Sequence, residues 1–188
     1  MKGFRVLTDY EQVRNIQKRI AKYTHGGSPD YYSAMSSIDI SREHFKQMET
    51  TPYFVAPKPA GYRCLLYVND IGEIFLQSRS VHIFQLDPKY ASDFFGSRNY
   101  ITSDTLIDTM LRSIDSVTDY QASSKTTDDE SSDSKAKTRT KRVHAFYIMD
   151  AMRINGQDVT HLNVDQRISL AKVKSFPVNN IIWLLFLL

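Results

Sequence analysis

The chain has little of several features that would place it in a particular class. It contains one cysteine, Cys64, which excludes an internal disulfide framework and is typical of a reducing compartment. Its N-terminal segment lacks the apolar region of a secretory signal, so none is expected. The apolar run at residues 181–188 is far shorter than the roughly 20 residues that a membrane-spanning helix needs, so no membrane contact is predicted. The formal net charge of +3 gives no overall polycation signal for nucleic acid.

What is present predicts one soluble α+β domain. The 188 residues suffice for a single core, and the aromatic content of 12% favours a sheet-rich fold. Apolar residues at intervals of three and four predict a helix over residues 9–23, and Ser41 is a candidate N-cap for a short helix over 42–48, with His44 where a capping box prefers Glu. Residues 63–68, 73–76 and 81–86 read as strands of an antiparallel meander, and 53–56 as a further strand. The predicted architecture is therefore antiparallel sheets with flanking helices.

A polar segment divides this pattern. Residues 123–142 contain only one apolar residue, Ala136, and their acidic half precedes their basic half. Such a segment buries too little surface to offset the entropy of ordering, so we expect a loop or disordered insertion. Residues 105–111 form a short apolar stretch before it. After it, residues 143–153 read as a strand, Asn155-Gly156 as a turn and 164–173 as a helix.

Lys58 is the candidate catalytic residue. It lies between Pro57 and Pro59, which restrict the backbone, and Gly61 follows where a phosphate would need to approach the main chain. Covalent nucleotidyl transfer needs an amine nucleophile that is held rigidly and can lose its proton. Arg63 brings a delocalised charge suited to phosphates or ribose. The five histidines show no ligand spacing and Cys64 has no cysteine partner, so no structural zinc site is predicted.

These residues resemble the motif Lys-x-Asp-Gly-x-Arg of the covalent nucleotidyltransferases, with matches at Lys58, Gly61 and Arg63. Alone the motif is weak, but its context adds to it. Residues 36–68 resemble the lead-in of the mRNA-capping guanylyltransferases, and Arg79 ends a strand like the family's ribose-contacting arginine. Residues 105–108 (TLID) and 146–157 (FYIMD, then NGQ) resemble two further motifs in the right order.

The resemblance implies the nucleotide-binding half of the nucleotidyltransferase (ATP-grasp-like) fold. It implies a guanylyltransferase that moves GMP from GTP, through a lysyl-GMP intermediate on Lys58, to the 5′ diphosphate end of RNA. Gly61, Arg63 and Arg79 would bind the nucleotide, and Mg²⁺ or Mn²⁺ would assist, with no metal ligand assigned in this chain. The implied partners are the RNA 5′ end and the RNA polymerase II transcription machinery, and the implied location is the nucleus.

Three departures leave an alternative open. Ala60 stands where the family has Asp, Met110 where it has Glu, and Met149 where an aromatic stacks on guanine. The alternative is a catalytically impaired or truncated guanylyltransferase-like module that binds RNA ends, cap or protein partners. An ATP-using ligase fits the motifs less well. The later family motifs and the oligonucleotide-binding domain would follow residue 188, so we expect residues 1–188 to be a partial domain.

The polar segment yields a prediction that is independent of function. Deleting residues 123–142 should change the free energy of unfolding by no more than about 1 kcal/mol, because the segment buries almost no apolar surface. Limited proteolysis of the intact chain should cut first within it. Protection of the segment in the free protein would contradict the prediction.

Overall fold

The computed structural model describes residues 3–26, 28–34, 39–51, 53, 60–91, 103–117 and 140–175. Within these ranges the chain forms one seven-stranded antiparallel sheet with the strand order β1-β4-β3-β2-β5-β6-β7. The strands are β1 (Phe4–Val6), β2 (Tyr62–Val68), β3 (Ile74–Ser78), β4 (Ile83–Leu86), β5 (Thr105–Val117), β6 (Thr140–Ile154) and β7 (Gln157–Asp158). The helices are α1 (Tyr10–Tyr23), α2 (Arg42–Thr50) and α4 (Val164–Ser175), with a 3₁₀ turn at Pro88–Tyr90. The predicted α+β class is confirmed.

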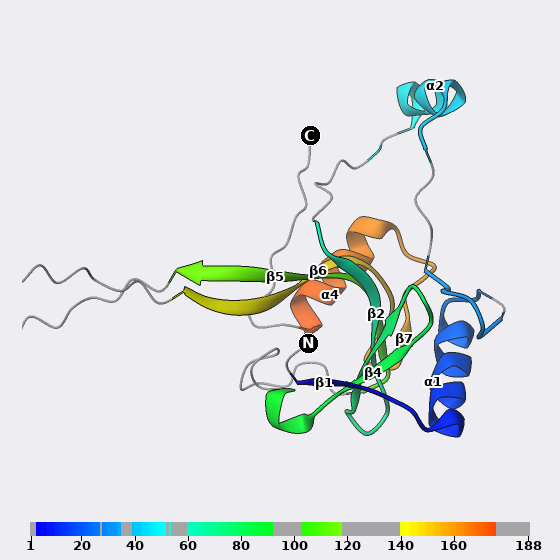
Figure 1. Ribbon diagram of the computed structural model, residues 1–188. Helices are drawn as coiled ribbons and strands as arrows, with labels where there is room; N and C mark the ends of the chain where they lie inside the picture. The colour runs from blue at the N-terminus through cyan, green and yellow to red at the C-terminus, as the bar shows by residue number, and fades with distance from the viewer. Residues whose placement is uncertain are drawn as a thin grey trace, which may run out of the picture.

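The two faces of the sheet carry two separate apolar clusters. Helix α1 places Ile16 and Ile20 on one face, against Leu65, Phe75 and Ile83. Helix α4 contributes Ala171 to the cluster on the other face, which the strands supply with these residues: Cys64, Leu66, Leu76, Ile107, Leu111, Phe146 and Ile148. Figure 1 shows α1 beside the curved sheet, with β5 and β6 running on beyond it as a long pair. The face covered by α1 is called the α1 face below.

Local capping follows the sequence closely. The Asp9 side chain accepts a hydrogen bond from the Gln12 amide and begins α1. At α2, the Ser41 amide donates to His44 Nδ1 at 2.9 Å and the Ser41 hydroxyl accepts from the His44 amide, so histidine completes the capping box. Helix α2 buries none of its residues and stands apart from the sheet (Figure 1).

Several predicted boundaries shift. The predicted strand at 81–86 begins only at Ile83, because Val81 has a positive φ of 64° inside the turn. Strand β5 contains the apolar stretch 105–111 and runs on to Val117, because it pairs with β6 along most of its length. Strand β6 begins at Thr140, so residues 140–142 belong to a strand and not to the expected insertion. The deletion that tests the polar segment should therefore be confined to residues 123–139. These residues lie outside the described ranges, and so do residues 54–56 of the predicted strand.

The Asn155-Gly156 turn is confirmed. Both residues have positive φ, 47° and 80°, which is the backbone of a tight hairpin turn between β6 and β7. No helix within the described ranges is long and apolar enough to cross a membrane.

Candidate functional site

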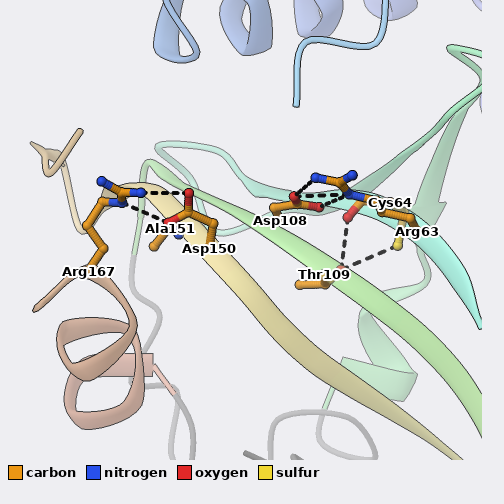
Figure 2. Close-up of polar contacts among 7 residues, drawn as sticks. All are labelled: Arg63, Cys64, Asp108, Thr109, Asp150, Ala151 and Arg167. Carbon is orange, nitrogen blue, oxygen red and sulfur yellow. Dashed lines mark hydrogen bonds and ion pairs between the residues drawn. The ribbon is translucent and has the colours of Figure 1, made fainter. Parts of the chain in front are cut away.

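A buried ion pair joins the two central strands β2 and β5 on the α1 face. Arg63 Nε lies 3.1 Å from both carboxylate oxygens of Asp108, and Nη2 lies 2.5 Å from Oδ2. The Asp108 side chain is only 4% exposed and that of Arg63 19%. Figure 2 shows the guanidinium lying along the carboxylate. Arg63 is therefore held rigidly at the start of β2, five residues after Lys58.

A second ion pair lies beside the first. Arg167 of α4 donates to Asp150 of β6 through Nε at 2.7 Å and Nη2 at 2.9 Å, and its Nη1 donates to the Leu162 carbonyl at 2.6 Å. In Figure 2, Arg167 reaches from α4 to Asp150 at the side of the strands, and Asp150 and Asp108 point the same way. Two hydrogen bonds from the guanidinium join α4 to β6, and the third joins it to the loop that precedes α4.

Irregular pairing of β6 brings the two aspartates together. Ile107 pairs with Ala151, Asp108 with Asp150, and Thr109 with Ile148, so Met149 is an extra residue on β6. The register of β6 shifts again between Ala151 and Arg153, which leaves Met152 without a partner on β5. Regular alternation would place Asp150 on the same face as Ile148, among apolar residues, and the extra residue turns it to the α1 face.

Electrostatics at Asp108 reflect two opposing effects. Burial raises the pKa of Asp108 and the negative charge of Asp150 adds to this, whereas Arg63 lowers it. On the other side of the same pair, the hydrogen bond to Asp108 raises the pKa of Arg63 despite its own burial. Desolvation decides the direction of the pKa change at Asp108, because its carboxylate is much more buried than the Arg63 guanidinium. The hydrogen bond to Asp150 likewise raises the pKa of Arg167.

The predicted nucleophile, Lys58, lies outside the described residues. Gly61, three residues later, passes very close to β5. A Cβ at this position would lie 2.5 Å from the Leu111 carbonyl oxygen and 3.0 Å from Met110 Cγ, which no side chain tolerates. The absence of a side chain at Gly61 therefore lets the segment that follows Lys58 approach the sheet.

Arg79 follows the end of β3, and the pairing of β2 with β3 ends one residue earlier, at Cys64 and Ser78. Burial raises the pKa of the Tyr32 hydroxyl, and Arg63 and Arg79 both lie near enough to it for their charges to lower that pKa in part. Arg79 is exposed in the turn between β3 and β4. Gln17 of α1 donates to the Val81 carbonyl in that turn at 3.1 Å. The structure thus brings together the two arginines that the sequence predicts as nucleotide contacts.

Two of the three departures from the family motifs lie together. Met110 pairs with Tyr147 in the register, and both are buried in a small cluster with Met149 packed against it. Arg63 is the partner of Met110 on the other side. An apolar cluster therefore adjoins Arg63 where the family places a glutamate and a stacking aromatic. Ala60, the third departure, is exposed.

The acidic and sulfur groups of the described residues do not form a metal site. Within the described ranges no three His, Cys, Asp or Glu side chains lie close enough to share an ion. Asp108 and Asp150 are each already paired with arginine. The described residues therefore provide no preformed cluster of three such ligands, and Mg²⁺ that accompanies a nucleotide takes ligands from phosphates and water as well as from one or two carboxylates. Burial raises the pKa of the Cys64 thiol to about 11, so this side chain, on the opposite face, stays protonated.

Sequence analysis did not identify Arg167 as part of the site. Its helix pattern was evident, but nothing in the spacing links residue 167 to residue 150. Asp108 and Asp150 were noted as parts of resembling motifs and not as partners. An Arg–Asp pair between a helix and a bulged strand leaves no signal in one sequence.

Comparison with known proteins identifies the family. The family model described as mRNA capping enzyme, catalytic domain, matches residues 1–127. The chain belongs to this family. The resemblance drawn from the motifs is thereby confirmed, and the matched part includes Lys58, Gly61, Arg63, Arg79 and Asp108, while β6 and α4 lie beyond it.

Two similar proteins agree with this assignment. The mRNA-capping enzyme subunit alpha of Schizosaccharomyces pombe is 29% identical over 112 residues, which cover 55% of this chain and 27% of that protein. The mRNA-capping enzyme of Caenorhabditis elegans is 26% identical over 112 residues, which cover 58% of this chain and 17% of that protein. The capping-family domain thus matches only a minor part of each relative.

The Arg167–Asp150 pair should stabilise the fold measurably. Arg167→Gln should lower the free energy of unfolding by about 2 kcal/mol, because it leaves a largely buried carboxylate without its charged donors. Asp150→Asn should do the same, and the double variant should lose less than the sum of the two. Urea denaturation measures all three. Arg19 and Asp70, an exposed pair at 3.1 Å, provide the control and should show no coupling. Additive losses at Arg167 and Asp150 would contradict the prediction.

Asp108 should make stability depend on pH in a defined direction. A carboxyl whose folded-state pKa is raised binds its proton more tightly in the folded state, so its contribution is present at low pH and is lost as pH rises through that pKa. The difference in unfolding free energy between the native chain and Asp108→Asn should therefore fall as the pH rises through the raised pKa of Asp108. Urea titrations at several pH values measure it. A rising difference would show that pairing with Arg63 outweighs burial.

Proposed function

We propose that this domain is guanylyltransferase-like and accepts GMP from GTP on Lys58. The family assignment supports this, as do the two capping-enzyme relatives. The observation that carries the proposal is the convergence of the motif residues. Arg63 at the start of β2 and Arg79 in the turn after β3 both lie near Tyr32, and Gly61 lets the segment after Lys58 lie against β5. Under this proposal the sheet is the nucleotide-binding half of the nucleotidyltransferase fold.

The chemistry would proceed in two displacements. Lys58 Nζ, once deprotonated, attacks the α-phosphorus of GTP; a phosphorus–nitrogen bond forms while the bond from that phosphorus to the bridging oxygen breaks and pyrophosphate leaves. A terminal phosphate oxygen of a 5′ diphosphate RNA end then attacks the same phosphorus, and Lys58 leaves as the amine. Arg63 and Arg79 would hold the nucleotide through their guanidinium groups. A divalent ion would accompany the triphosphate and neutralise part of its charge.

The setting follows from the same proposal. The RNA 5′ end would be the acceptor, the nucleus the location and the transcription machinery of RNA polymerase II a partner, as the resemblance implies. The names of both relatives state mRNA capping, which supports the acceptor.

A second function is favoured by one observation, the apolar cluster of Met110, Tyr147 and Met149 beside Arg63. Arg63 is also engaged by Asp108 through three short contacts. A domain with this arrangement would retain a nucleotide or an RNA 5′ end without transferring GMP. It would then act as a binding module of the capping family.

Labelling with α-³²P-GTP and a divalent ion tests the first proposal. The native chain should form a covalent adduct that resists denaturing electrophoresis. Lys58→Ala should abolish the adduct, whereas Lys89→Ala, which removes an exposed lysine outside the motif, should keep it. Adduct formation that survives Lys58→Ala would refute the assignment of Lys58.

Restoring the family residues distinguishes the two functions. The double variant Ala60→Asp with Met110→Glu should increase labelling of an active domain and create it in an impaired one. The matched variant Ala60→Asn with Met110→Gln should do neither, because it lacks the two charges. GTP binding by the native chain without an adduct, followed by an adduct in the restored variant, would establish the binding module.

A further inference from the structure

A cavity of about 280 Å³ lies between helix α1 and the turn that joins β2 to β3. It is slightly smaller than the pockets of roughly 300–1,000 Å³ that hold drug-sized ligands, so one long side chain suits it better than a whole nucleotide. Arg63 lies at the start of β2, whereas this turn follows the end of the same strand at Val68. The cavity is therefore separate from the candidate nucleotide site, and neither function proposed above uses it.

The floor of the cavity is apolar. Ile16 of α1 and Phe75 of β3 are buried and line it, together with the buried ring of Tyr67 from β2. The Tyr67 and Phe75 rings are stacked, with their centroids 6.1 Å apart. Ile71, which is 76% exposed, adds an apolar group where the cavity meets solvent. The methylene groups of a long polar side chain can pack on such a surface.

One carboxylate of the lining has no cation beside it. Glu73 accepts hydrogen bonds from Asn69 Nδ2 at 2.8 Å and from Gln85 Nε2 at 3.3 Å, and within the described ranges it forms no ion pair. Both donors are neutral amides, so they hold the carboxylate in place without cancelling its charge. A carboxylate has about four acceptor sites, so about two stay available. The other carboxylate of the lining, Asp70, is already paired with Arg19 at 3.1 Å.

The turn that carries Glu73 is held by its own hydrogen bonds. Asn69 Oδ1 accepts from the Ile71 amide at 3.1 Å and from the Glu73 amide at 2.8 Å. Gln85 accepts from Arg5 at 2.8 Å, so an amide group separates the Glu73 carboxylate from that guanidinium. The carboxylate is therefore preorganised, and a ligand loses little affinity in ordering it.

Two carboxamides of α1 line the same cavity. Gln12 and Asn15 lie three residues apart, so their side chains are neighbours on one face of the helix. Among the residues that the structure describes, neither side chain forms a hydrogen bond, and Gln12 uses only its backbone amide in the cap of α1. Each carboxamide offers a donor and an acceptor, as a peptide group does. Carboxamides beside an apolar floor therefore suit the main chain of a bound peptide.

We propose that this cavity binds an arginine or lysine side chain from a basic peptide segment of a partner protein. The aliphatic part of that side chain packs on Ile16 and Phe75, and its cationic head pairs with Glu73. Gln12 and Asn15 contact the main chain on either side of it. Among the described residues that line the cavity, the charge without a counter-charge is negative, so charge complementarity favours a cationic occupant. The inference does not depend on the proposed function of the domain.

Two peptides that differ in one charge test the proposal on the native chain. The probe is fluorescein-labelled Gly-Ser-Leu-Arg-Gly-Ser, and its match carries citrulline, a neutral isostere, in place of arginine. Fluorescence anisotropy at low ionic strength should show the arginine peptide binding about tenfold more tightly. Equal affinity of the two peptides would overturn the proposal, and so would a failure of the arginine peptide to bind at millimolar concentration.

Exchanging the charge within the cavity gives the matched experiment. Glu73→Gln should lower the affinity for the arginine peptide to that for the citrulline peptide, and Glu73→Lys should favour a peptide with glutamate at that place. Glu11→Gln removes an exposed carboxylate of α1 outside the lining and should leave both affinities unchanged. All three variants should melt at the temperature of the native chain, because the replaced side chains are exposed. A preference for arginine that survives Glu73→Gln would refute the site.

The α1 side of the cavity and the source of the cation are tested together. The double variant Gln12→Ala with Asn15→Ala should weaken the arginine and citrulline peptides by the same factor, because it removes main-chain contacts and no charge. Agmatine has the guanidinium and the aliphatic chain of arginine without a peptide group, and it should compete about tenfold less well than the unlabelled arginine peptide. Competition by agmatine as strong as by the peptide would overturn the assignment of a peptide as the occupant.

Discussion

The contact between Arg63 and Asp108 constrains the middle of the sheet more than any other. Both side chains belong to central strands, and the carboxylate is almost fully buried. A slip of one residue between β2 and β5 would turn Asp108 toward the apolar cluster of the opposite face and leave its charge unpaired there, at a cost of several kcal/mol. The pair therefore fixes the register that also aligns Arg63 with Met110 and Gly61 with the backbone of β5.

This register also determines how the charged side chains of the α1 face are arranged. Asp150 faces Asp108 only because β6 carries an extra residue at Met149. Two carboxylates side by side would repel each other, and Arg167 offsets the second charge as Arg63 offsets the first. Arg79 adds a third guanidinium to these two pairs and is exposed. Among the described residues, the two paired aspartates therefore lie close to the exposed guanidinium of Arg79, which suits an anionic ligand.

The far end of the sheet is held by a separate network. Asp104 accepts from the Tyr23 hydroxyl at 2.6 Å and from Arg153 Nε at 2.7 Å, and the Arg153 guanidinium lies 4.5 Å from the centre of the Tyr23 ring. These contacts tie the end of α1 to β5 and β6. Helix α1 is therefore anchored at one end, while the segment after it, which carries Tyr32, extends toward Arg63 and Asp108.

Much of this protein was determined by local sequence. The apolar spacing of α1, the cap at Ser41, the paired strands on either side of Asn69 and the Asn155-Gly156 turn depend on residues close in the chain. The motif around Lys58 predicted the family only together with the other resembling segments in the same order. Other features depend on residues far apart. The extra residue at Met149, the choice of Arg167 as partner for Asp150 and the long pairing of β5 with β6 were decided by the tertiary structure. One physical reason applies to the charged pairs: a buried charge is stable only beside an opposite charge. Which residue supplies that charge depends on the face of the sheet on which each strand places its side chains.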